Sequence, residues 1–372
     1  MRVLLLSAYA ATSHEYWRQR LLSMFADWEW TSLILPARHF SWRVRGNPLY
    51  WSVAQREQLS EHYDLLVATS MVDLATLRGL VPELASVPSL VYFHENQFEY
   101  PVQQGHSESL EAQMVSIYSA LAADHIVFNS RYNRDTFLAG VDRLLAKLPD
   151  FVPTDIVNSL QARASVVPVP IALEPPRSGV SLWPIRSQVN RVRIVWLGRF
   201  EYDKAPERLL GLLDVLARNQ VPIQLAVVGQ QFRQRPEAFD TIASLHADSL
   251  IHMGYIDERT EYCQLLRESD LVVSTARHEF QGIAVGEAVA AGCTPIVPDR
   301  LAYTEFYAPQ YRYDSFDDDP HRESEAAAQR VMQLAPQRLQ ADLPAAVEDW
   351  SETALLQLYL QAFCKAGCVL PG

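Results

Sequence analysis

The sequence lacks several features that would place it in a common class of protein. No apolar run approaches the roughly 18 residues that a membrane-spanning helix requires, so we expect no membrane span. Basic residues are in deficit, with 32 Lys and Arg against 44 Asp and Glu and a net charge of −12. This balance argues against a general polyanion-binding surface but leaves room for a local basic patch.

Cysteine is scarce, and its pattern does not fit zinc. Cys364 and Cys368 form a close pair, but nothing completes a set of four ligands. We therefore expect reduced thiols at Cys263, Cys293, Cys364 and Cys368, and a cytoplasmic protein. The apolar run Val3–Leu6 near the N-terminus is too short for the core of a signal peptide, so a first β-strand explains it better.

Two nucleotide-binding motifs are missing. No G-x-G-x-x-G follows a predicted strand, which argues against an NAD-linked Rossmann enzyme, and no GxxxxGK[ST] marks a P-loop. A metal-binding Asp-x-Asp is not convincing either, because Asp317–Asp319 reads as a surface acidic run. We expect neither a cofactor nor a metal.

The sequence does contain a regular alternation of short apolar segments and helical segments. It predicts an α/β protein with doubly wound, Rossmann-like parallel sheets, in two halves. Strands are expected in the first half at Arg2–Ala8, Thr31–Leu35, Leu65–Thr69, Ser89–His94 and His125–Phe128. They are expected in the second half at Arg193–Leu197, Gln224–Val228, Ile251–Met253, Asp270–Thr275 and Thr294–Val297.

A proline-rich stretch, Val167–Trp183, separates the two halves and predicts a linker. At 372 residues the chain favours two domains. We expect an N-terminal domain over 1–172, a linker over 173–190 and a C-terminal domain over 191–345. A final helical segment, 346–372, is expected to return to the first domain.

Polar residues follow the predicted strands of the first half. Ligands of open parallel sheets bind outside the carboxyl ends of the strands, which places His94, Glu95, Asn129 and Ser130 where chemistry usually occurs. An alternative for Asn129 and Ser130 is that they merely cap the helix predicted to begin at Arg131.

The segment Trp30–Arg56 contains no Asp or Glu in this acidic protein. Arginine binds phosphate, and flat aromatic rings stack on unpaired bases, so the segment is a candidate RNA contact. The alternative is an apolar flap with a solvated rim. Its arginines are Arg38, Arg43, Arg45 and Arg56, and its aromatic residues include Trp30, Phe40, Trp42, Tyr50 and Trp51.

Two stretches of the second half suit a nucleotide-sugar. Gly198–Lys204 (GRFEYDK) follows a predicted strand, and Arg199 with Lys204 makes a reasonable diphosphate clamp, although both are equally explained as surface cations. His278–Asp299 reads HEFQGIAVGEAVAAGCTPIVPD, with seven residues between Glu279 and Glu287. The helix that begins near Gly282 directs its N-terminus at a bound phosphate, and both carboxylates can accept sugar hydroxyls. The alternative is a capping Glu and an ordinary helical Glu.

Taken in order, the two halves, the linker, GRFEYDK and the Glu-x7-Glu pattern resemble the retaining GT-B glycosyltransferases of family 4. Four longer segments are similar to the tRNA-queuosine mannosyltransferase group within them: LPARHFSWRVRGNPLYWS, YFHENQFEYPV, VFNSRYNRDTFL and HEFQGIAVGEAVAAGC. The resemblance implies transfer of mannose from GDP-mannose to queuosine at the wobble position of tRNA-Asp, with retention at the anomeric carbon.

The resemblance also implies a role for individual residues. Arg199 and Lys204 contact the diphosphate, Glu287 binds the ribose, and Glu279 holds hydroxyls of the donor sugar. The donor loop of Phe280, Gln281, Gly282, Ile283 and Ala284 lines sugar and phosphate. His94 lies beside the transferred sugar and is, with Glu279, a predicted catalytic residue. The acceptor side of the site comprises Thr12, Ser13, His14, Glu95, Asn96, Gln97, Asn129 and Ser130.

The sequence departs from the family pattern at three places. Ala10 and Ala11 replace glycines of the first loop, Phe280 and Gln281 change the usual EGFG, and Ala205 replaces the glycine of the usual KG. These changes keep the charged groups and alter the freedom of the backbone.

We expect Arg38, Trp42, Arg43 and Arg45 to contact the tRNA, and a metal-independent, front-face reaction. Two other hypotheses stay open. One is a GT-B enzyme with a lipid or polysaccharide acceptor, and the other is a non-catalytic protein that binds a sugar-nucleotide or RNA. The sequence alone leaves the donor base and the oligomeric state undetermined.

Overall fold

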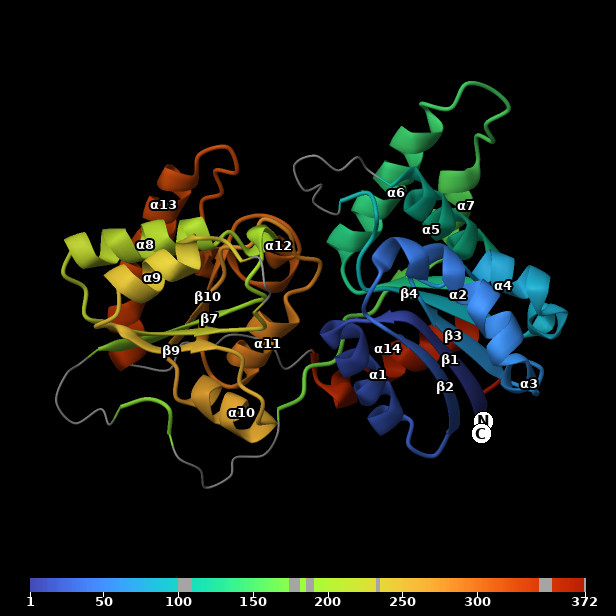
Figure 1. Cartoon of the computed structure of the whole chain (residues 1–372), viewed down its shortest axis with the longest axis horizontal. Helices are drawn as coiled ribbons and strands as arrows, with labels where there is room; N and C mark the ends of the chain where they lie inside the picture. Colours follow the sequence, from blue (N-terminus) through green and yellow to red (C-terminus); the bar gives the residue numbers. More distant parts are fainter. Residues whose placement is uncertain (100–108, 174–180, 185–190, 232–234, 341–349, 371–372) are drawn as a thin grey trace. The chain divides into compact units, whose positions relative to one another are not determined.

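A computed structural model of the chain describes residues 1–99, 109–173, 181–184, 191–231, 235–340 and 350–370 (Figure 1). The chain forms two compact units, one of Met1–Pro170 with Trp350–Gly372 and the other of Ile171–Asp349. Most of the predicted linker, and residues 100–102 of the YFHENQFEYPV segment, lie outside the described residues.

The first unit contains a six-stranded parallel sheet in the order β2-β1-β3-β4-β5-β6. Its strands alternate between two buried faces. Leu4 and Leu6 of β1 face a core that they share with Trp51, whereas Tyr92 of β4 stacks on Trp17 on the opposite face. A parallel sheet covered on both faces needs apolar residues at successive positions, which explains the unbroken apolar runs. The strands are β1 (Arg2–Ala10), β2 (Glu29–Pro36), β3 (Leu65–Thr69), β4 (Ser89–Phe93), β5 (His125–Phe128) and β6 (Ala164–Val166).

Helices cover both faces of this sheet (Figure 1). They are α1 (Thr12–Met24), α2 (Phe40–Ala54), α3 (Arg56–Leu59), α4 (Leu74–Leu80), α5 (Leu110–Ala122), α6 (Arg131–Leu145), α7 (Ile156–Ala162) and α14 (Glu352–Lys365), with the 3₁₀ turn η1 (Pro82–Ser86). The last helix, α14, packs against α1: the indole of Trp17 donates to the Tyr359 hydroxyl at 3.0 Å, and Phe363 contacts Phe25. The predicted return of the C-terminal helix to the first domain is confirmed.

Helix α2 lies where no helix was predicted, in the basic and aromatic segment. The sequence Gly46-Asn47-Pro48 within it suggests a break, because Pro48 has no N–H for the carbonyl of Val44. The buried side chain of Asn47 compensates, since its Nδ2 donates to the Val44 carbonyl at 3.0 Å and to the Arg43 carbonyl at 2.7 Å. The helix therefore continues through the proline.

The second unit contains another six-stranded parallel sheet, in the order β12-β11-β10-β7-β8-β9. Its strands are β7 (Val192–Leu197), β8 (Ile223–Val228), β9 (Leu250–Gly254), β10 (Leu271–Val273), β11 (Thr294–Pro298) and β12 (Arg312–Tyr313). Its helices are α8 (Pro206–Arg218), α9 (Ala238–Leu245), α10 (Arg259–Arg267), α11 (Ile283–Ala290), α12 (Tyr303–Phe306) and α13 (Pro320–Gln340), with the 3₁₀ turns η2 (Tyr202–Lys204) and η3 (Pro309–Tyr311).

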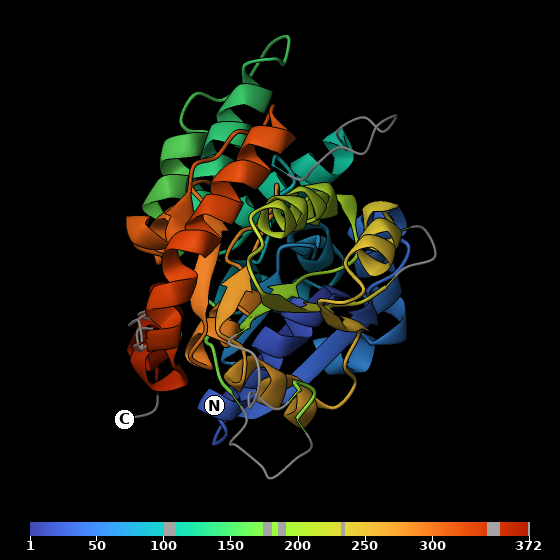
Figure 2. The same ribbon diagram turned by 90° about the vertical axis from the view of Figure 1, so that its left-hand side faces the viewer.

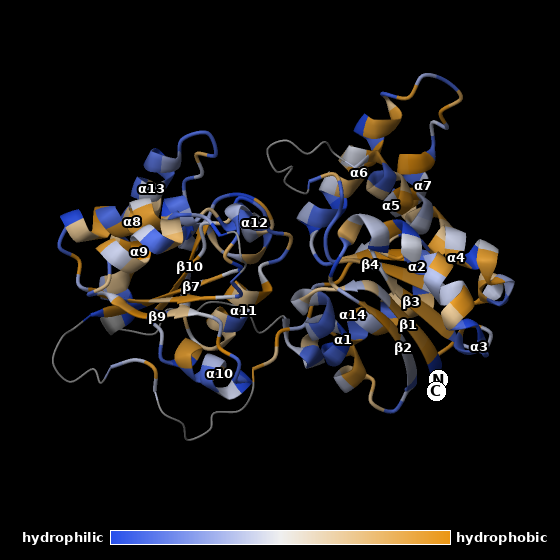
Figure 3. Ribbon diagram, viewed as in Figure 1, coloured by the Kyte–Doolittle hydropathy of each residue, from blue (hydrophilic) through white to orange (hydrophobic). Residues whose placement is uncertain are grey.

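In this unit α8, α9 and α13 cover one face of the sheet, and α10 and α11 cover the other (Figure 1). Figure 2 shows α8 and α9 side by side. Hydropathy follows this layering, since the strands are hydrophobic and the helices carry hydrophilic outer surfaces (Figure 3). The predicted α/β class with two Rossmann-like sheets is confirmed. No helix in the described part of the chain is both long and apolar enough to cross a membrane.

Candidate active site

The predicted donor residues gather beyond the carboxyl ends of strands in the second unit. The turns after β7 and β8 approach closely: a Cβ at Gly229 would lie 1.8 Å from the carbonyl oxygen of Gly198. Glycine at position 229 is therefore required for this contact. The turn after β7 leads into η2, which ends at Lys204.

Lys204 is the centre of the charge cluster in this unit. Its Nζ donates to the carbonyl of His278 at 2.9 Å and to Oε2 of Glu279 at 3.1 Å, and it lies 3.1 Å from Oδ2 of Asp203. Burial by itself lowers the pKa of Lys204, but the two carboxylates outweigh it and raise that pKa above its ordinary value. Burial raises the pKa of Glu279, and the nearby ammonium more than offsets this, so that the carboxyl stays ionised at neutral pH.

Arg199, the other predicted clamp residue, is half-exposed. Its guanidinium lies 2.9 Å from Oε2 of Glu201 and 3.6 Å from Oδ2 of Asp203. Both cations of the predicted clamp are thus paired with acidic neighbours. An incoming diphosphate would compete with these carboxylates for both cations.

The donor loop turns sharply before α11. Gly282 has a φ of 82°, and a Cβ there would lie 2.8 Å from Cε1 of Tyr303, whose hydroxyl bonds Oγ of Ser274 at 2.8 Å. The glycine that the sequence retains in this motif is thus the one that the fold requires. Phe280 and Gln281 are buried and do not have positive φ, so the two departures at these positions are compatible with the turn.

The departures at Ala205 and at Ala10–Ala11 differ in backbone conformation. Ala205 is buried and adopts the left-handed conformation, with a φ of 47°, where glycine is favoured. Ala10 ends β1, and Ala11 is extended with a φ of −63°, so neither position needs glycine for its backbone.

Glu287 lies on α11 and is buried. Its Oε1 accepts from Nη2 of Arg259, and its Oε2 accepts from the hydroxyl of Tyr262 at 3.1 Å. Arg259 also donates to the Ala172 carbonyl at 3.3 Å. Neither Arg259 nor Tyr262 was predicted from the sequence. Their three-residue spacing at the start of a helix that follows a strand is the signal that could have identified them.

In the first unit His94 follows β4 and lies among aromatic rings. It stacks on His14 of α1, with ring centroids 4.2 Å apart, and contacts Trp17 at 4.9 Å and Tyr92 at 4.7 Å. Burial, with a smaller contribution from His14, holds the pKa of His94 well below its usual range. The ring is therefore neutral at physiological pH.

The residues that follow His94 have different environments. Glu95 bonds to Nε2 of His14 at 3.0 Å and to the hydroxyl of Ser70 at 2.9 Å. The Asn96 amide is buried, and its Nδ2 donates to Oδ1 of Asn133 at 2.9 Å. Gln97 lies near the sulfur of Met71, with its Nε2 at 3.7 Å.

Ser130 caps a helix, as the alternative allowed, whereas Asn129 makes a different contact. Oγ of Ser130 accepts from the backbone N–H of Asn133 at 3.0 Å and caps α6. Nδ2 of Asn129 donates to the carbonyl of His94 at 2.8 Å and so anchors the backbone of that residue. Thr12, Ser13 and His14, predicted on the acceptor side, form the first turn of α1, where Thr12 and Ser13 are exposed and His14 is buried.

The predicted RNA-contact residues lie before and within α2. Arg38 is exposed, and Trp42 is 54% exposed. The Trp42 ring lies over Gly46, where a Cβ would approach it to 2.5 Å. Arg43 donates to the Pro36 carbonyl at 3.4 Å, and Arg45 pairs with the buried Asp73 and, at 3.3 Å, with Glu111. Within the described part of the chain, Arg45 therefore makes more ion pairs than Arg38 or Arg43.

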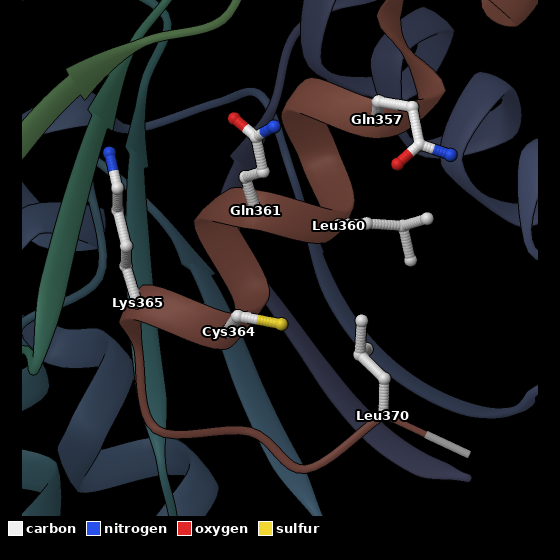
Figure 4. Close-up of a pocket in the computed structure, with 6 residues that line it drawn as sticks. All are labelled: Gln357, Leu360, Gln361, Cys364, Lys365 and Leu370. Atoms are coloured by element: carbon white, nitrogen blue, oxygen red, sulfur yellow. The ribbon is translucent and has the colours of Figure 1, made fainter. Parts of the chain in front are cut away.

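A separate hollow lies beside α14, away from these residues. Figure 4 shows Gln357, Leu360, Gln361, Cys364 and Lys365 along the helix, with Leu370 beyond its end. None of the predicted site residues lines it. Within the described residues, no group of three or more His, Cys, Asp or Glu side chains has a metal-binding arrangement.

Comparison with known proteins agrees with this architecture. The family model described as tRNA-queuosine alpha-mannosyltransferase N-terminal matches residues 2–171, and the model of group 1 glycosyl transferases matches residues 183–341. The tRNA-queuosine alpha-mannosyltransferase of Drosophila melanogaster is 34% identical over 292 residues, which cover 76% of this chain and 75% of the fly protein.

Two solved structures show the same fold at low identity. Sucrose-phosphate synthase from Thermosynechococcus elongatus has a TM-score of 0.65 at 16% identity, over 98% of this chain and 100% of that chain. The N-terminal domain of trehalose-6-phosphate phosphatase from Candida albicans has a TM-score of 0.67 at 14% identity, over 98% and 97% of the two chains. The fold is GT-B, and the protein is a glycosyltransferase. The matches to both halves and the identity to the fly enzyme show that the chain belongs to the tRNA-queuosine alpha-mannosyltransferase family.

Proposed function

We propose that the protein transfers mannose from GDP-mannose to queuosine at the wobble position of tRNA-Asp, with retention at the anomeric carbon and in the cytoplasm. The observation that carries the proposal is the 34% identity to a fly protein that bears the name tRNA-queuosine alpha-mannosyltransferase. The choice of GDP-mannose and of tRNA-Asp rests on the resemblance of the four sequence segments.

The donor half of the reaction breaks the bond between C1 of the sugar and a diphosphate oxygen. Negative charge grows on the leaving diphosphate, where Lys204, Arg199 and the N-terminus of α11 stabilise it. These positive groups supply the role that a divalent ion would otherwise fill, so we propose a reaction without metal. The acidic neighbours of both cations support a site in which the diphosphate displaces carboxylates as it binds.

Two carboxylates hold the donor by its hydroxyl groups. Glu279 accepts hydrogen bonds from hydroxyls of the sugar, and Glu287 accepts those of the ribose. The ion pair between Glu279 and Lys204 supports a binding role for this carboxylate over attack on C1. Front-face attack by the acceptor follows, with the departing phosphate helping to take the proton of the acceptor hydroxyl.

The acceptor half of the site uses the first unit. A neutral His94 lies beside the transferred sugar and orients it. Arg38, Trp42 and Arg43 contact the tRNA, and Arg45 supports α2 through its pair with Asp73. This small basic and aromatic surface compensates for a net charge that is unfavourable for RNA.

The test is a mass analysis of tRNA nucleosides after incubation of the purified protein with GDP-mannose. Queuosine-containing and queuosine-free tRNA are compared, each with and without a metal chelator. We expect one hexose on queuosine-containing tRNA alone, with or without the chelator. Intact GDP-mannose with no product on either tRNA would reject the donor and the acceptor, and loss of product with the chelator would reject metal independence.

A further inference from the structure

A hydrogen-bonded chain runs from Ser70 through Glu95 to His14. The Ser70 hydroxyl donates to Oε1 of Glu95 at 2.9 Å, and Oε2 of the same carboxylate lies 3.0 Å from Nε2 of His14. Ser70 follows β3, Glu95 follows β4 by two residues, and His14 lies in the first turn of α1. Three segments that are distant in sequence are thus joined at the carboxyl edge of one sheet.

His14 links these hydrogen bonds to His94 by ring stacking. The two imidazole rings are stacked, with an interplanar angle of 23°. His94 Nε2 and His14 Nδ1 are both buried, and neither has a hydrogen-bond partner among the residues that the structure describes. Packing against neighbouring rings therefore orients His94. His14 is oriented by its hydrogen bond to Glu95.

We propose that Glu95 is a positioning residue that holds His14 in one tautomer and orientation, and through the stacked ring fixes His94. This inference rests on the proposed function, in which His94 orients the transferred sugar. A carboxylate oxygen only accepts, so His14 makes this bond as a donor through Nε2–H. Without Glu95 the ring can turn over or change tautomer, and the face on which His94 rests shifts.

Loss of the Glu95 side chain should mainly lower the rate of transfer, kcat. A displacement of a fraction of an ångström to an ångström at a group beside the reacting centre lowers kcat by about 10- to 100-fold. Glu95 belongs to the first unit, whereas the residues predicted to bind the diphosphate and the ribose belong to the second. We therefore expect the KM for GDP-mannose to change by less than about threefold.

The first test compares steady-state transfer by Glu95→Ala, Glu95→Gln and the wild type. Glutamine can accept from His14 with its oxygen and donate to the Ser70 hydroxyl with its amide, so Glu95→Gln should restore most of the lost kcat. Glu99→Ala is the control, because Glu99 pairs with the exposed Arg143 and should leave kcat unchanged. A normal kcat in Glu95→Ala, or a Glu95→Gln enzyme as slow as Glu95→Ala, would overturn the proposal.

A second test reads the tautomer directly. Proton–nitrogen correlation spectra of protein labelled with ¹⁵N-histidine distinguish the two neutral tautomers, and a His14→Gln spectrum assigns the His14 signal. We expect the Nε2–H form in the wild type and in Glu95→Gln, and a mixture in Glu95→Ala. An unchanged His14 tautomer in Glu95→Ala would refute the proposal even if kcat falls. This reading does not need turnover, so it separates failure of the positioning role from failure of the proposed function.

Discussion

At the scale of single residues, Lys204 is distinguished by the groups around it. Its ammonium is shared by Glu279, Asp203 and the His278 carbonyl, and its stem packs against Gly198. Burial also lowers the pKa of His278 to about 4, and Lys204 adds to this effect, so that the neighbouring imidazole is neutral and Lys204 remains the cation nearest Glu279.

We predict that Lys204→Ala lowers the rate of mannosyl transfer by an amount equivalent to about 2–4 kcal/mol of transition-state stabilisation, the scale of a lost oxyanion donor. The cause is the loss of positive charge at the departing phosphate. Single-turnover transfer at saturating tRNA and GDP-mannose measures the effect.

The exposed Lys147 provides the matched control, since Lys147→Ala removes the same charge from the surface of the other unit. That variant should transfer at the wild-type rate. A Lys204→Ala enzyme that also transfers at the wild-type rate would remove Lys204 from the clamp. Binding of GDP-mannose and the unfolding midpoint, measured on the same preparations, separate an effect on chemistry from loss of the fold.

At the scale of elements, the turn before α11 depends on one glycine. Gly282→Ala adds left-handed strain of about 1–2 kcal/mol and overpacking of about 1–3 kcal/mol against Tyr303. Gly292→Ala adds the strain alone, because Gly292 has a φ of 105° and its nearest neighbour would be 3.9 Å from the Cβ. We predict that Gly282→Ala lowers the free energy of unfolding by more than Gly292→Ala does. Denaturant unfolding of both variants tests this, and equal losses would show that the Tyr303 contact relaxes.

Arg38, just before α2, and Trp42, within it, allow the contributions of charge and of base stacking to tRNA binding to be measured separately. Arg38→Ala should weaken tRNA binding and reduce the slope of log affinity against log salt by about 1, because a phosphate contact is lost. Trp42→Ala should cost about 1–3 kcal/mol of binding through lost base stacking and leave the salt slope unchanged. Titration of queuosine-containing tRNA at several salt concentrations measures both quantities.

The control for α2 is Arg143→Ala, which removes an exposed arginine of α6 that pairs with Glu99. Slow hydrolysis of GDP-mannose by water serves as the second readout and should be unchanged in Arg38→Ala and Trp42→Ala. If hydrolysis and transfer fall together in these variants, α2 is a structural flap instead of a tRNA surface.

The elements that the sequence predicted well are those whose pattern is local. Leu65–Thr69 and His125–Phe128 are apolar at every position or nearly so, and both strands have the predicted bounds. Helix α2 was missed because Pro48 and Gly46 signal a break, and the compensating bonds of the Asn47 side chain depend on the folded geometry.

The same distinction holds at the candidate site. The spacing of Glu279 and Glu287 and the strand–turn position of Lys204 are visible in the sequence, and the structure brings Lys204 and Glu279 together. The partners of Glu287 were not predicted, because Arg259 and Tyr262 reach it only after α10 packs beside α11. The bonds from Glu95 to His14 and Ser70 were missed for the same reason, since 81 and 25 residues separate these partners in the chain.

At the scale of the whole molecule, helix α14 near the C-terminus belongs to the first unit, with residues Met1–Pro170. Tyr359 of α14 bonds Trp17 of α1 and also the carbonyl of Pro168, at 3.0 Å each. Trp17 and Tyr92 form the wall around His94, and the Tyr92 hydroxyl donates to the carbonyl of Val167 at 2.7 Å. The C-terminal helix therefore supports both the histidine pocket and the segment just before the second unit begins.

We predict that Tyr359→Phe destabilises the first unit by about 1–3 kcal/mol and leaves the second unit unchanged. The change keeps the packing of the ring but leaves the buried indole N–H of Trp17 without its acceptor, which costs the desolvation of a polar group. Hydrogen exchange read separately for β1 and β7 measures the two units, and protection should fall in β1 alone. Tyr118→Phe is the control, because the Tyr118 side chain is exposed and should give no change. Equal losses of protection in β1 and β7 would mean that the units unfold together, and unchanged protection in β1 would mean that the Tyr359 hydroxyl is dispensable.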